Sequence, residues 1–155
     1  SGYKIAQFLP MQLASGQERL GLVTSGKNYN YYDENRKKLA NGFVQDSMSN
    51  WYYFDKNGNM VKNAKFTYIN SGKNSGTYFF MSNGVSFRGG LLTSGKYTYY
   101  FDKDGRMVKN KKVKAGVYTY TLNKSGHLTA EKYTASSKNS ATTHNTLSKD
   151  VKKKK

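Results

Sequence analysis

Aromatic side chains beside lysine and amide groups are the residues of this sequence best suited to hold a ligand. The chain has 14 Tyr, 8 Phe and 1 Trp among 155 residues. An aromatic ring gives the C–H face of a pyranose a flat apolar platform, and lysine or amide groups can hydrogen-bond its hydroxyls. These residue types are what a sugar-binding site requires.

Groups for catalysis are sparse. Asp33, Asp55 and Asp102 occupy the same position of a repeated turn, where we expect each to cap its own backbone. His127 and His144 are 17 residues apart and form no metal or triad spacing. The chain has no Cys, and its glycines mark turns rather than a phosphate loop. We therefore expect no enzyme, metal or cofactor here, whether the chain acts alone or as the non-catalytic module of a larger secreted enzyme.

The charge points to a different class of ligand. The net charge is +17, of which residues 132–155 contribute +6 and the remainder +11. Such a field favours polyanions, including nucleic acid, teichoic-type wall polymers and anionic lipid, and it does not choose among them. No apolar run is long enough to span a membrane, so no membrane span is expected.

A short repeat positions the aromatic residues. The pattern of aromatic residues, a polar turn and Gly is clearest at 51–58 and 99–105, with weaker copies at 31–36, 78–84 and 120–126. The corresponding turn positions are spaced by 22, 26, 21 and 21 residues. Segment 19–27 also recurs as 88–96, 69 residues later. The chain is therefore a repeat array that contains a larger duplication.

Each repeat predicts an aromatic strand, a tight turn such as 55–58 and a second short strand such as 59–62. One such hairpin cannot bury a face alone, so neighbouring hairpins must stack. We predict an all-β fold, a β-solenoid of tandem short β-hairpin repeats of about 21 residues, over residues 1–133. Residues 134–155, rich in Lys, Ser and Thr, are predicted to be a flexible tail.

Alternation along the strands separates two columns of side chains. The inner column stays apolar or aromatic apart from Asn30 and is predicted to face the core; it contains Tyr32, Tyr52, Phe54, Tyr78, Phe80, Tyr99, Phe101, Tyr120 and Leu122. The outer column loses its aromatic character toward the C-terminus and is predicted to bind sugar through Tyr29, Tyr31, Trp51, Tyr53, Phe79 and Tyr100. An alternative of equal weight is that these rings pack one repeat against the next.

The run at 51–63 resembles the cell-wall-binding and glucan-binding repeats of Gram-positive surface proteins, which flank the catalytic core of glucansucrases and are related to choline-binding repeats. The resemblance covers about residues 8–133 and implies a β-solenoid whose pockets hold α-glucan near an enzyme or a cell. It places the platform on Tyr53 and Tyr100, and the polar contacts on Lys62, Lys109 and Gln45. The paired Trp residues of choline-binding repeats are missing, so no choline site is expected.

Two binding functions remain open from the sequence. The first is non-catalytic binding of an extracellular polysaccharide, most simply a dextran-like α-glucan, at the wall or surface of a Gram-positive bacterium. The second is electrostatic adhesion to an anionic wall polymer such as teichoic acid. Single-stranded nucleic acid fits the basic, aromatic composition but not the hairpin repeat, and it ranks last.

Overall fold

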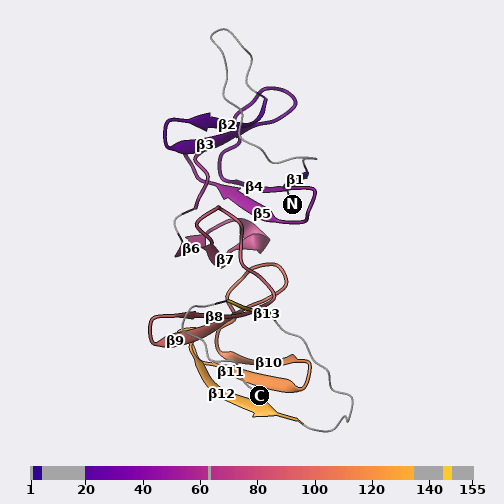
Figure 1. Ribbon diagram of the computed structural model, residues 1–155, viewed down its shortest axis with the longest axis vertical. Helices are drawn as coiled ribbons and strands as arrows, with labels where there is room; N and C mark the ends of the chain where they lie inside the picture. The colour runs from indigo at the N-terminus through magenta and orange to yellow at the C-terminus, as the bar shows by residue number, and fades with distance from the viewer. Residues whose placement is uncertain (1, 5–19, 63, 135–144, 148–155) are drawn as a thin grey trace. The chain divides into compact units, whose positions relative to one another are not determined.

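The protein is built almost entirely from short β-strands. The computed structural model describes residues 2–4, 20–62, 64–134 and 145–147 (Figure 1). The one helical element among them is a 3-10 turn, η1 (Gly72–Asn74). The strands are β1 (Gly2–Lys4), β2 (Gly21–Ser25), β3 (Asn28–Tyr32), β4 (Gly42–Gln45), β5 (Trp51–Phe54), β6 (Lys65–Ile69), β7 (Gly76–Phe80), β8 (Gly90–Ser94), β9 (Tyr97–Phe101), β10 (Lys111–Ala115), β11 (Tyr118–Leu122), β12 (Leu128–Tyr133) and β13 (Asn145–Leu147). The predicted all-β class is confirmed.

The chain forms two compact units. Unit 1 comprises residues 1–67 and 79–86, and unit 2 comprises residues 68–78 and 87–155. Unit 1 contains the antiparallel hairpins β2–β3 and β4–β5, with β1 parallel to β4. Unit 2 contains the hairpin β8–β9, with β13 parallel to β8, and the antiparallel sheet β10–β11–β12. Strands β6 and β7 form a further two-stranded sheet.

The main partner of an aromatic strand precedes it in the chain. Strand β5 pairs along its whole length with β4, whereas Met60 forms only an isolated bridge with Phe54. The prediction of a strand at 59–62 is therefore wrong. The reason is that the backbone N–H of Met60 donates to the carbonyl of Tyr29, at 2.9 Å, and so links this segment to the preceding repeat.

One side chain closes each tight turn. Asp55 Oδ1 accepts hydrogen bonds from the backbone N–H groups of Asn57 and Asn59, both at 2.9 Å. The N–H of Gly58 donates to the Asp55 carbonyl at 2.8 Å, and the φ of +80° at Gly58 is one that glycine adopts without strain. Asp33, Asp102 and Asn123 accept the same pair of bonds in their turns. The prediction that the three repeated aspartates cap their own turns is confirmed.

The inner column lies in the core, as predicted. Its buried members are Tyr52, Phe54, Tyr78, Phe80, Phe101, Tyr120 and Leu122, while Tyr32 and Tyr99 are half-buried. Asn30, the polar member, is also buried. Its side-chain N–H group donates to the Gly58 carbonyl at 2.6 Å and to Asn59 Oδ1 at 3.1 Å. The buried amide thus ties its own hairpin to the turn of the next repeat.

Two aromatic residues of the outer column are buried in the core. Tyr31 and Tyr53, both predicted to stand outside it, are each only 7% exposed. Each ring packs against an inner-column ring of the next repeat, with ring centroids 6.2 Å apart for Tyr31 and Phe54 and 6.3 Å apart for Tyr53 and Phe80. The prediction of exposed platforms at these two positions is wrong. A strand in a single sheet can leave one face free, but here the next hairpin covers that face.

The predicted C-terminal tail contains one paired strand. Strand β13 aligns Asn145 with Gly90 and Leu147 with Leu92, parallel to β8. The N–H of Thr134 donates to the Val117 carbonyl at 2.6 Å. Residues 135–144 and 148–155 lie outside the described residues. The Lys-, Ser- and Thr-rich composition gave no signal of this parallel pairing.

Replacing Asp55 tests the turn. We expect Asp55→Ala to lower the free energy of unfolding by about 1–2 kcal/mol, because two backbone N–H groups lose their acceptor. Asp55→Asn retains an acceptor oxygen, as Asn123 already does in its own turn, and should lose less than half as much. Urea unfolding followed by near-ultraviolet circular dichroism measures both. Equal losses in the two variants would contradict this account of the turn.

Candidate functional site

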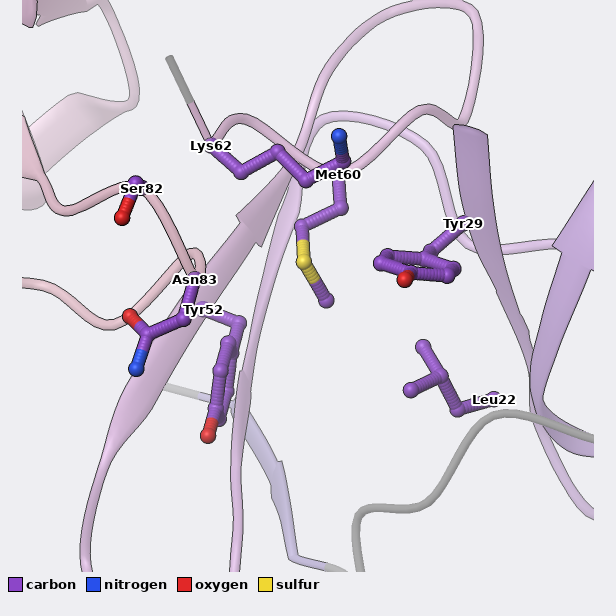
Figure 2. Close-up of a pocket in the computed structure, with 7 residues that line it drawn as sticks. All are labelled: Leu22, Tyr29, Tyr52, Met60, Lys62, Ser82 and Asn83. Atoms are coloured by element: carbon purple, nitrogen blue, oxygen red, sulfur yellow. The ribbon is translucent and has the colours of Figure 1, made fainter. Parts of the chain in front are cut away.

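Unit 1 contains a pocket of about 340 Å³ (Figure 2). Its wall is contributed by β2, β3, β5, the segment after the 55–58 turn and the loop after β7; the lining residues are Leu22, Tyr29, Tyr52, Met60, Lys62, Ser82 and Asn83. Figure 2 shows Tyr29 and Leu22 on one side, Tyr52 and Asn83 on the other, and Met60 between them. Two tyrosine rings, a thioether, a hydroxyl, an amide and an ammonium group therefore surround one cavity.

Two of the predicted binding residues meet in this pocket. The ammonium group of Lys62 lies 5.5 Å from the centroid of the Tyr29 ring, within the range of a cation–π interaction. Both side chains are half-buried. Lys62 reaches Tyr29 because the Met60 N–H bond to the Tyr29 carbonyl anchors the backbone two residues earlier. The contact therefore joins one repeat to the next.

Tyr52 is held in place by a buried carboxylate. Its hydroxyl donates to Asp46 Oδ2 at 2.8 Å. Burial raises the pKa of Tyr52 well above its ordinary value, and the bond to Asp46 raises it further. Burial alone would raise the pKa of Asp46, but hydrogen bonds from Asn50, Tyr52 and Met48 outweigh it and hold that pKa below its ordinary value of 3.8. Asp46 thus remains a carboxylate that fixes the ring in the pocket wall.

Gly84 allows the loop after β7 to approach the pocket. A Cβ atom at this position would lie 2.6 Å from Met60 Sδ and 3.4 Å from Tyr52 Cδ2. The φ of +91° at Gly84 also disfavours any other residue. Asn83 Oδ1 accepts a hydrogen bond from the Val85 N–H at 3.0 Å, which shapes the same loop. The amide of Asn83 is therefore set at the rim of the pocket.

The other predicted site residues lie elsewhere. Gln45 and Trp51 are aligned across β4 and β5, on the sheet face that also carries Tyr53 and away from Tyr52. Phe79 packs edge-on against Phe66 at 5.5 Å. In unit 2, Tyr100 is half-buried with its centroid 5.8 Å from that of Tyr120, and Lys109 is exposed. The structure therefore brings together Tyr29 and Lys62 from the predicted set.

Five pocket residues were not anticipated from the sequence. Tyr52 was assigned wholly to the core, although its ring edge also lines the cavity; the others are Leu22, Met60, Ser82 and Asn83. A signal was present in the recurrence of Tyr52 and Met60 as Tyr99 and Met107, 47 residues later. This recurrence does not indicate which residues of a neighbouring repeat each of them contacts.

Unit 2 repeats the backbone of this pocket with different side chains. The N–H of Met107 donates to the carbonyl of Thr77, so Thr77 takes the place of Tyr29. Gly126 approaches Met107 as Gly84 approaches Met60, with a Cβ at 2.6 Å from the sulfur. His127 stacks on Tyr97, with centroids 3.6 Å apart and ring planes 4° apart. The ring that faces Lys62 in unit 1 is thus a threonine in unit 2.

The described part of the chain offers no metal centre, since it holds no group of three or more His, Asp or Glu side chains placed to bind a metal ion. Nor does a helix within the described ranges have the length and apolarity needed to cross a membrane. The repeated aspartates are occupied in closing turns.

Comparison with known proteins finds two repeat families that match parts of the chain. Residues 89–133 match the family described as choline-binding repeat, and residues 41–60 match the family described as putative cell wall binding repeat. Glucosyltransferase-S of Streptococcus mutans is 41% identical over 54 residues, which are 35% of this chain and 4% of that protein. These matches, together with the glucosyltransferase relative, support a glucan-binding and cell-wall-binding repeat family for these parts of the chain. The resemblance seen in the sequence is confirmed.

Two solved structures resemble the fold of this chain. Truncated alternansucrase from Leuconostoc mesenteroides matches with a TM-score of 0.66 and 31% identity over 71% of this chain. Choline-binding protein F from Streptococcus pneumoniae matches with a TM-score of 0.58 and 23% identity over 72% of this chain, a likeness of fold alone. The chain spans 10% of the alternansucrase structure and 4% of the glucosyltransferase. Binding to carbohydrate or to the cell wall is the class of function that the repeat family supports for it.

Replacing Asp46 tests how the Tyr52 wall of the pocket is fixed. The depressed pKa of Asp46 stabilises the folded state above its ordinary value of 3.8, and this contribution is lost as pH falls through the lower folded-state pKa. The free energy of unfolding of the native protein, relative to Asp46→Asn, should therefore be largest near neutral pH and should shrink below 3.8. Urea unfolding at several pH values measures this difference. A difference that is constant with pH would contradict the carboxylate's role.

Proposed function

We propose that this chain binds a neutral extracellular polysaccharide, an α-glucan of the dextran type, without cleaving it. The observation that carries the proposal is the unit 1 pocket, in which the Tyr29 and Tyr52 rings face polar groups of Lys62, Ser82 and Asn83. The half-buried Tyr29 ring and the Tyr52 ring in the pocket wall offer an apolar face, and the polar side chains offer hydroxyl partners, which are the two contacts that a pyranose needs.

The relatives support an α-glucan as the polymer. Alternansucrase structures that match over 71% and 72% of this chain, at 31% identity, hold isomaltotriose and isomaltononaose. Those ligands belong to that protein, and they motivate the choice of sugar here. We propose an extracellular location at the wall or surface of a Gram-positive bacterium, with the hairpins of residues 1–133 stacked as a β-solenoid that forms the binding module. Cross-repeat bonds such as Met60 N–H to Tyr29 carbonyl support that stacking.

A single pocket of this kind should bind weakly, and retention on a polymer then depends on several contacts along it. The proposal therefore differs from the sequence prediction in where the strongest contact lies. Tyr53 packs against Phe80 and is not among the residues that line the pocket, so the proposal assigns it no contact with sugar. The half-buried ring of Tyr29 takes its place in unit 1, with the buried Tyr52 in the pocket wall and Lys62 retained.

Adhesion to an anionic wall polymer is the second candidate, favoured by the charge of +17. Strand β10 displays exposed lysines at 111, 112 and 114, and Lys109 precedes them. Such attraction between exposed charges is screened over a few ångströms at high salt. Stacking of a sugar on a ring is much less sensitive to salt.

Affinity electrophoresis in a native gel containing dextran tests the first proposal. We expect the protein to be retarded relative to a dextran-free gel, and Tyr29→Ala to lose about two- to tenfold in apparent affinity because the platform ring is removed. Tyr68→Ala is the matched control, since Tyr68 is 67% exposed and lies outside the pocket. The retardation should persist when the gel contains about 0.5 M salt, well above the physiological range.

Two outcomes would count against α-glucan binding. One is unchanged mobility of the native protein in dextran; the other is equal retardation of Tyr29→Ala and the native protein. Binding to purified teichoic acid that disappears at the same salt concentration, together with unchanged mobility in dextran, would favour the second candidate.

A further inference from the structure

The ammonium group of Lys62 already lies over the Tyr29 ring. Lys62 Nζ lies 5.5 Å from the ring centroid, and Lys62 also lines the pocket. An aromatic face attracts a cation through its quadrupole, and this attraction is how proteins recognise quaternary ammonium groups such as choline. Lys62 therefore already supplies this pocket with a positive charge of the kind that such a ligand would carry.

The rest of the pocket would suit a quaternary ammonium group if the lysine were absent. Tyr29 and Tyr52 provide two rings, and Met60 provides a polarisable sulfur between them. The lining thus combines two rings and a sulfur, groups that can attract a cation, with the ammonium group of Lys62.

We propose that Lys62 is the specificity-determining residue of this pocket, acting as a tethered cation that excludes quaternary ammonium ligands and leaves the cavity to neutral, hydroxylated ones. A second cation entering beside Tyr29 would meet the lysine charge at close range in a partly desolvated site, where like charges repel strongly. A neutral sugar meets no such repulsion, and the ammonium group can donate hydrogen bonds to its hydroxyls. This inference rests on the proposed sugar binding only for the identity of the accepted ligand.

Unit 2 supplies an internal control. Lys109 occupies the position equivalent to Lys62, two residues after Met107, but Thr77 stands where unit 1 has Tyr29. Lys109 is exposed, whereas Lys62 is half-buried. Removing the charge of Lys109 therefore changes the net charge equally without uncovering an aromatic ring.

The test is a titration with tetramethylammonium chloride, using sodium chloride at the same concentration as the reference. Binding is followed by the NMR shift of the Met60 methyl group, which lies in the pocket. We expect Lys62→Met to bind at least about tenfold more tightly than the native protein, because the ring face becomes available to the ligand. Lys62→Arg keeps a cation at this position and should stay as weak as the native protein.

Three results would overturn the proposal: native protein that binds tetramethylammonium as tightly as Lys62→Met, equal gains in Lys62→Met and Lys109→Met, or a folded Lys62→Met that gains nothing. Adding Tyr29→Ala to Lys62→Met should abolish the gain, and its persistence would also count against Tyr29 as the acceptor. Dextran retardation of the native protein is measured separately. If that retardation is absent while Lys62→Met gains tetramethylammonium affinity, the sugar proposal fails and the role of Lys62 stands.

Discussion

A hairpin of two short strands cannot bury either of its faces alone, and the need to cover both faces governs this structure. Each unit meets the need by packing outer-face rings of one repeat on inner-face rings of the next: Tyr31 on Phe54 and Tyr53 on Phe80 in unit 1, and Tyr100 on Tyr120 in unit 2. Backbone bonds from Met60 to Tyr29, and from Met107 to Thr77, fix the same register in both units. Rings that a single sheet would expose become part of the core.

The candidate site lies where this packing of rings leaves one ring only half-buried. In unit 1 the Tyr29 ring is only half-buried, and the ammonium group of Lys62 lies over its face. Asp46 fixes the opposite wall through the hydroxyl of Tyr52, and Gly84 lets a polar loop come close. The pocket is therefore made by two consecutive repeats and the loop of a third.

The sequence predicted the strands, the turns and the inner column, because all three depend on local patterns. Alternation along β5 identified Phe54 as a core residue, and the repeated Asp and Gly positions identified the turns. The sequence did not predict the burial of Tyr53 or the absence of a strand at 59–62. Both depend on contacts with neighbouring repeats, and a local sequence pattern carries no information about those contacts. Tyr29 and Lys62 were both identified as candidates, but their contact across repeats required the structure.

A titration with isomaltotriose, monitored through the methionine methyl groups by NMR, tests the central claim most directly. The chain has five methionines. Of these, Met60 lines the pocket, Met107 holds the equivalent position beside Thr77, and Met48 is 79% exposed. We predict a saturable shift of the Met60 methyl that exceeds those of Met107 and Met48 and persists at high salt. A Met60 signal that stays unchanged at saturating sugar, or that moves no more than Met48, would contradict the assignment of this pocket.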